Sequence, residues 1–117
     1  MPFEMLDRRR VQFRPLSERA NRVRIESEAV DPDREPGELS ESVRAAVARA
    51  AERIAAAHSN DRPVMMAFGA HAIKNGLGPV LIRMMERGWL THLATNGAGI
   101  IHDWEFACAG ESSEHVE

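Results

Sequence analysis

The apolar positions after residue 39 follow first a helical and then a strand pattern. From Ser40 the chain is rich in alanine, and larger apolar residues recur at steps of four, three and four: Val43, Val47, Ala50 and Ile54. This spacing predicts a helix with one apolar face, capped by Ser40 or Ser42. After a polar turn, residues 64–68 form a continuous apolar run without alternation, which predicts a buried parallel strand.

A second helix and a second strand follow. Residues 69–78 form a loop with three glycines, Pro79 suits the first turn of a helix, and Gly88 ends that helix. We expect its large apolar side chains to face inward: Val80, Leu81, Met84 and Met85. Residues 89–94 are a second apolar run, and a final helix is predicted over residues 100–109.

This alternation of helices and strands predicts an α/β fold with helices flanking a parallel sheet. Strands joined through helices have right-handed crossovers, so both strand-to-helix loops open at one edge of the sheet, where ligands bind. Two strands do not make a stable open sheet. We therefore expect an incomplete sheet that a partner or a further segment completes.

The first 38 residues differ in character from the rest. Residues 1–25 are rich in arginine and contain Pro15, and residues 26–37 are acidic with two prolines and a glycine. We divide the chain into an extended arm with its linker, residues 1–38, and a partial α/β nucleotide-binding domain, residues 39–117. A phosphate- or RNA-binding arm is one interpretation, but the lack of interleaved aromatic residues favours a solvated or subunit-contacting extension.

Composition narrows the class of protein further. The formal charge of −3, from 15 basic and 18 acidic residues, is too close to neutral to indicate a nucleic-acid partner. Cys108 is the only cysteine, so no intramolecular disulfide forms, and we expect this thiol to pack in the core. No stretch resembles a signal peptide or an apolar run of ~20 residues, so we expect a cytoplasmic protein without a membrane partner.

Two glycine-bearing loops carry the candidate binding residues. They run from Gly69 to Gly78 and from Thr95 to Gly99. Glycines let a ligand approach the backbone, and free amides at a helix N-terminus favour an anion such as a phosphate. The alternative is that the glycines only make tight turns. Neither loop has the G-x-G-x-x-G or the P-loop pattern.

His102, Asp103 and Glu105 fall in the first turns of the final predicted helix. An imidazole beside a carboxylate can bind a cationic amine or transfer a proton, although the helix dipole alone also favours carboxylates there. The five histidines show no H-x-x-x-H spacing, so we expect no metal site. A metal-dependent phosphohydrolase would rest on the adjacent His102 and Asp103 alone.

Taken together, the two loops resemble those of the deoxyhypusine synthase family. There, one strand leads into a loop of the type Thr-Ser-Asn-Leu-Ile-Ser-Ser-Gly and the next into Thr-Ala-Gly-Gly-Val-Glu-Glu-Asp. Here residues 69–76 read Gly-Ala-His-Ala-Ile-Lys-Asn-Gly, and residues 96–103 read Asn-Gly-Ala-Gly-Ile-Ile-His-Asp. The resemblance extends from Met66 to about Gly110, and it looks closest to the bacterial and archaeal relatives of the family.

The resemblance implies a Rossmann-like, homotetrameric transferase that binds NAD and moves an alkyl group from an amine through an imine. The cofactor positions of the family match Ala70, His71, Ala72, Ile73, Lys74, Asn96, Gly97 and Ala98. His102 and Asp103 match positions that contact the amine. Because Ile101 and His102 replace two glutamates, we expect a polyamine other than spermidine or a guanidino compound, with a protein lysine as one candidate acceptor.

The catalytic lysine of the family lies farther downstream. The only lysine of this chain, Lys74, matches a cofactor-loop position, so we expect the chain alone to be inactive. The alternative function is a non-catalytic nucleotide-binding or oligomerisation module that keeps the fold.

Overall fold

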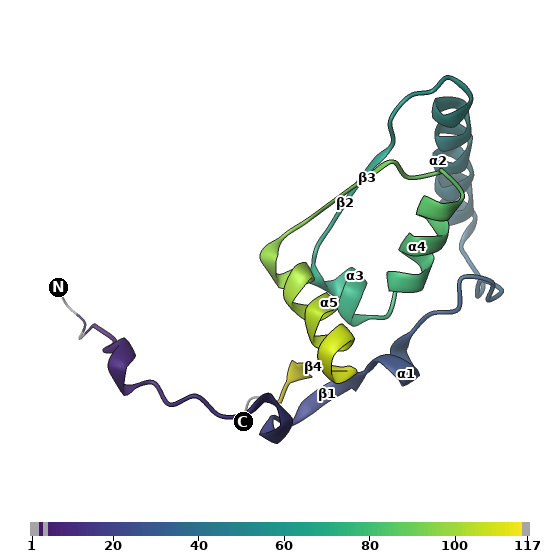
Figure 1. Ribbon diagram of the computed structural model, residues 1–117. Coiled ribbons are helices and arrows are strands. Elements are labelled where there is room, and N and C mark those ends of the chain that lie inside the picture. Colours follow the sequence, from purple (N-terminus) through teal and green to yellow (C-terminus); the bar gives the residue numbers. More distant parts are fainter. Residues whose placement is uncertain (1–2, 4, 116–117) are drawn as a thin grey trace.

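The structure is a computed structural model that describes residue 3 and residues 5–115 (Figure 1). In this part, the chain is a mixed α/β protein with two sheets of two strands each. The helices are α1 (Ile25–Glu28), α2 (Glu41–Ser59), α3 (Ala70–Lys74), α4 (Gly78–Glu86) and α5 (Gly97–Ala109). The strands are β1 (Asn21–Arg24), β2 (Met65–Phe68), β3 (His92–Thr95) and β4 (Glu111–Glu114). Short 3-10 helices lie at Arg8–Arg10 and Leu16–Glu18.

Strands β2 and β3 pair in parallel, which confirms the prediction, with Met65 opposite His92 and Phe68 opposite Thr95. The chain passes from one strand to the other through α3 and α4, and α3 forms a short helix inside the loop predicted to be irregular. Both strands end at the same edge, where α3 and α5 begin (Figure 1). Over the residues described, the parallel sheet consists of these two strands, so its extension to a Rossmann-like sheet stays a prediction.

Only one face of the parallel sheet is covered. Paired residues of parallel strands point to the same face, so Phe68 and Thr95 lie together, and both border a pocket with α4 and α5. On the other face Met65 is 69% exposed, and Ala67, His92 and Ala94 are exposed as well. The expectation of a strand buried on both faces is therefore wrong for this chain, because no described helix packs on the second face.

The hydrophobic core is small. Its buried members are Ile73, Leu81, Leu90 and Phe106, and partly buried side chains such as Phe68 and Met84 pack against them. The prediction that the large apolar side chains of α4 face inward is confirmed for Leu81 but is wrong for Met85, which is 41% exposed. Cys108 is also exposed, contrary to expectation, because the buried side of α5 carries Glu105 and Phe106. The spacing of apolar residues predicted the helices, but it did not predict which of these side chains are buried against another segment.

A second sheet joins the two ends of the chain. Strand β1 pairs antiparallel with β4, with Asn21 opposite Glu114 and Val23 opposite Ser112. The Ile25 amide adds a 2.9 Å hydrogen bond to the Gly110 carbonyl. The arginine-rich and Ser/Glu-rich sequences of these strands give no strand signal. The part of the arm nearest the linker is thus packed against the C-terminal part of the chain.

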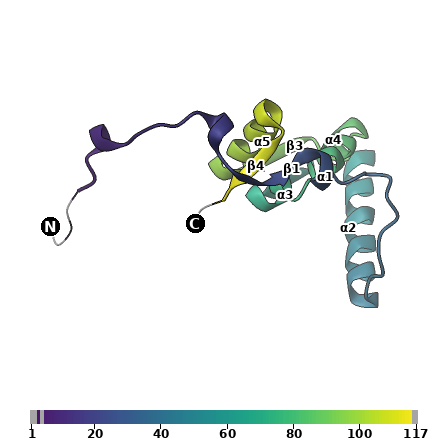
Figure 2. The same cartoon turned by 90° about the horizontal axis from the view of Figure 1, so that it is seen from below.

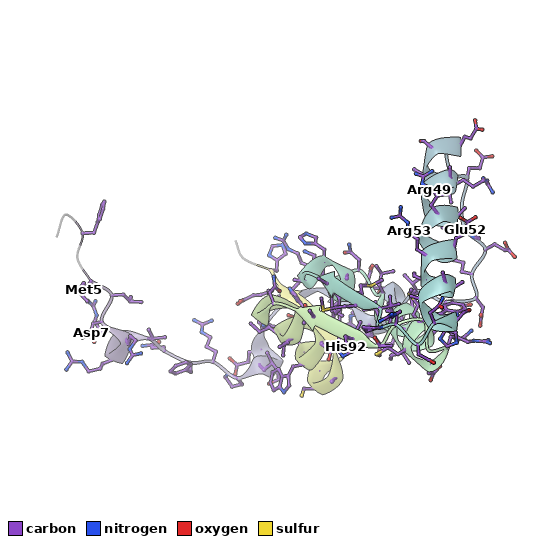
Figure 3. All side chains as sticks on the ribbon, turned by 90° about the horizontal axis from the view of Figure 1, so that it is seen from above. Met5, Asp7, Arg49, Glu52, Arg53 and His92 are labelled. Atoms are coloured by element: carbon purple, nitrogen blue, oxygen red, sulfur yellow. The ribbon has the colours of Figure 1, made fainter. Side chains whose placement is uncertain are left out.

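Two segments project from the core. Ser40 caps α2 as predicted, with its Oγ accepting a hydrogen bond from the Val43 amide. Apart from Ile54 and Ala57, every residue of α2 is exposed, and the helix extends beyond the rest of the molecule (Figure 2). The arm before β1 extends in another direction, so its labelled side chains lie far from those of α2 (Figure 3).

Candidate functional site

The two glycine-bearing loops lie side by side at the carboxyl edge of the parallel sheet. Helices α3 and α5, which begin in these loops, pack against each other. A Cβ atom placed on Gly69 would lie 3.9 Å from Nδ2 of Asn96, so the loop backbones are close. Asn96 caps α5, because its Oδ1 accepts a 3.0 Å hydrogen bond from the Gly99 amide. The edge predicted from the alternating pattern therefore exists.

Gly99 sets how closely α5 approaches β3. The residue is buried, and a Cβ atom at this position would clash with Oγ1 of Thr95 at the end of β3. At Gly97, by contrast, a Cβ atom would meet nothing within 4 Å. Close packing thus needs a glycine at position 99, whereas Gly97 leaves open space in front of the start of α5.

A pocket of about 310 Å³ lies beside these loops. Its residues come from β2, β3, α3, α4 and α5: Phe68, Ile73, Gly78, Leu81, Ile82, Met85, Leu93, Thr95, Gly99, Ile100 and Asp103. Most of the lining is apolar, and Asp103 supplies its only carboxylate. The size is at the low end of the range for small-molecule sites, ~300–1,000 Å³. The pocket suits an apolar group that carries one positive charge.

Of the residues predicted from the sequence, Ile73 and Asp103 line the pocket. The others at the edge lie outside its lining: Ala70, His71, Ala72, Lys74, Asn96, Gly97 and Ala98. His71 and residues 96–98 are exposed there. The α4 wall was missed, although its members Gly78, Leu81, Ile82 and Met85 recur at helical spacing and so could have been found as one face.

His102 belongs to a different group of side chains from Asp103. Its Nδ1 lies 2.6 Å from Oγ of Ser112, and this hydroxyl donates a 2.5 Å hydrogen bond to Oε2 of Glu105. A serine hydroxyl has one proton, and since that proton goes to the carboxylate, His102 Nδ1 must be the donor to Ser112. Consecutive helical residues point about 100° apart. Asp103 therefore faces the pocket, while His102 faces β4.

Arg19 completes this polar cluster, which we define as Arg19, His102, Glu105 and Ser112; Glu105 and Ser112 are buried, and Arg19 and His102 are partly buried. Arg19 Nη1 donates a 2.6 Å hydrogen bond to Oε1 of Glu105. This bond, more than the one from Ser112, lowers the pKa of Glu105, against the opposing effect of burial. The same bond raises the pKa of Arg19. The cluster joins the arm, α5 and β4. Of its four members, the sequence pattern had indicated only His102 and Glu105, which lie close together in the chain.

The described residues contain no group of three or more His, Cys, Asp or Glu side chains that could hold a metal ion. Within the same range, no helix is both long and apolar enough to span a bilayer. No family model matches the chain, and comparison with curated proteins and with solved structures gives no match.

Proposed function

We propose that this chain supplies part of the NAD site of a cytoplasmic, deoxyhypusine synthase-like transferase that acts on a small polyamine or guanidino compound. The observation that carries the proposal is the meeting of both glycine-bearing loops beside an apolar pocket with the single carboxylate of Asp103. Ligands of α/β proteins bind at this edge. The family resemblance of the same two loops adds the choice of cofactor.

The edge fits a dinucleotide in three respects. The α5 N-terminus, with the open space in front of Gly97, suits a phosphate, because the first amides of a helix have no partner within it. Asn96 and His71 are exposed beside it and can donate or accept hydrogen bonds. The apolar pocket takes a ring. NAD bound there would supply the hydride acceptor for oxidation of the amine.

Asp103 is the residue we assign to the amine. Its exposed carboxylate borders an otherwise apolar pocket and can form a charge-assisted hydrogen bond with an ammonium or guanidinium. His102 would act indirectly, because its Nδ1 is bound to Ser112 and holds α5 in place. With Ile101 57% exposed and no second carboxylate in the pocket, a short amine fits better than a long polycation.

Calorimetric titration tests this proposal. We expect NAD alone to bind, and putrescine or agmatine to bind to the NAD complex more tightly than spermidine does. Asp103→Asn should weaken amine binding about tenfold or more while leaving NAD binding unchanged. Glu52→Gln, on the projecting α2, is the matched control. If NAD does not bind, or if Asp103→Asn binds amines as the wild type does, the proposal fails.

A non-catalytic nucleotide-binding module is the second candidate. It is favoured by the position of Lys74, the only lysine, which is partly buried at the end of α3 and does not line the pocket. No lysine of this chain can therefore form an imine with a ligand in the pocket. NAD binding without affinity for any amine would favour this module over the transferase.

A further inference from the structure

Helix α2 carries an apolar face whose N-terminal half is exposed in the described part of the chain. We call Val43, Val47, Ala50 and Ile54 the α2 seam; they recur at the spacing of a two-helix contact. Val43 and Val47 are 45% and 56% exposed, although they are the largest apolar side chains of the N-terminal half of the helix. Aliphatic side chains repeated on one helical face are typical of a packed face.

A groove lies where the C-terminal half of α2 meets the core. It measures about 560 Å³, is nearly free of polar surface, and is lined by residues that include Val47, Ala51, Ile54, Met66, Met84 and Trp89. Trp89 forms the far side of the groove and is 46% exposed. The α2 seam runs directly into this groove, because Val47 and Ile54 belong to both. Seam and groove together form one continuous apolar surface.

The chain exposes more surface than a compact chain of its mass. The accessible area is 9815 Å², whereas a compact chain of 13.0 kDa has about 6,300 Å². The radius of gyration is 19.1 Å, against about 13 Å for a compact domain of this length. The excess of roughly 3,500 Å² is spread over both projecting segments, the arm and α2, and an interface of standard size needs about 800 Å² from each copy.

We propose that α2 pairs in antiparallel orientation with α2 of a second copy, so that Val43 of each copy enters the groove beside Ile54 of the other. The exposed valine Val43 lies on the projecting N-terminal half of α2, and the groove lies where α2 meets the core. A two-fold axis near the middle of the helix therefore places Val43 of each copy in the groove of the other. Ala50 and Ala51 are small enough for the helices to approach closely. Helical spacing places Glu52 on the side of α2 opposite the seam.

This interface does not depend on the proposed NAD site. Sedimentation equilibrium of the 117-residue chain should give twice the monomer mass. Val47→Glu places a charge in the seam and should raise the dimer dissociation constant roughly a hundredfold or more. Ala45→Glu adds the same charge on the opposite side of α2 and should leave the constant unchanged, with helix content checked by circular dichroism for both.

A crosslinking experiment fixes the orientation even if Val47→Glu unfolds the chain. In a Cys108→Ser background, chains with Val47→Cys are mixed with chains that carry Ala50→Cys. We expect a disulfide between these two variants to form far faster than a disulfide between two Ala45→Cys chains. A monomeric wild type, a dimer that tolerates Val47→Glu, or capture of a different protein by α2 without self-association would overturn the proposal. A crosslink between equivalent positions along the whole helix would show a parallel pair and would also overturn it.

Discussion

Arg19 Nη1 donates a 2.6 Å hydrogen bond to Oε1 of Glu105, although the two residues lie 86 positions apart. Glu105 is only 7% exposed, so the bond joins a buried carboxylate on α5 to the base of the arginine-rich arm. Ser112 on β4 donates to the other oxygen of the same carboxylate. One side chain thus holds three segments of the chain together.

Loss of the Glu105 charge should destabilise the protein. Glu105→Gln leaves a partly buried guanidinium without its charged partner, and we expect the free energy of unfolding to fall by about 2 kcal/mol. Urea titration followed by circular dichroism measures this change. Glu52→Gln, an exposed change on α2 away from Arg19, should have little effect. Equal unfolding curves for the two variants would show that the bond contributes nothing.

The same carboxylate predicts a pH dependence. Arg19 lowers the pKa of Glu105 in the folded state below the ordinary value of 4.5. The folded state therefore holds this proton less tightly than the unfolded state, so the stabilisation is present above pH 4.5 and is lost as the pH falls through the lowered pKa. Urea titrations at several pH values below 6 should show this loss in the wild type and a weaker one in Glu105→Gln. Parallel pH profiles would contradict the assignment.

The hydrogen-bond chain predicts the tautomer of His102. Because Ser112 donates to Glu105, the neutral His102 ring should carry its proton on Nδ1. Long-range proton–nitrogen NMR spectra of the imidazole distinguish the two tautomers. Ser112→Ala should release this preference, since the acceptor is gone. A neutral ring protonated on Nε2 in the wild type would contradict the network.

The contact between α5 and β3 predicts an asymmetry between two glycines. Gly99→Ala should destabilise the protein by about 1–3 kcal/mol, because the new methyl group meets Thr95 at the end of β3. Gly97→Ala should lower the free energy of unfolding much less, since its Cβ atom would enter open space. Thermal unfolding of both variants and of Gly99→Ala with Thr95→Ala makes the comparison. The double variant should recover part of the loss; no recovery would place the strain elsewhere.

The local elements could be predicted from the sequence because short-range rules determine them. Ser40 caps α2, Pro79 lies in the first turn of α4, and Gly110 ends α5 in a left-handed conformation with φ of 69°. The two apolar runs became parallel strands, and this placed both glycine-bearing loops at one edge. Asp103 was singled out because it follows the second strand, and Ile73 because it matches a cofactor position of the resembled family; both line the pocket beside this edge.

Only the tertiary structure decided which faces of the helices and strands pack against another segment of the chain. The strand pairing of Val23 with Ser112 and the bond from Arg19 to Glu105 join residues with no local pattern that relates them. His102 and Asp103 are neighbours in sequence, yet the helical turn sends one to β4 and the other to the pocket. Met65, Met85 and Cys108 are exposed despite their apolar character. Periodicity specifies a helix or a strand through contacts a few residues apart, whereas burial depends on which distant segments pack against each face.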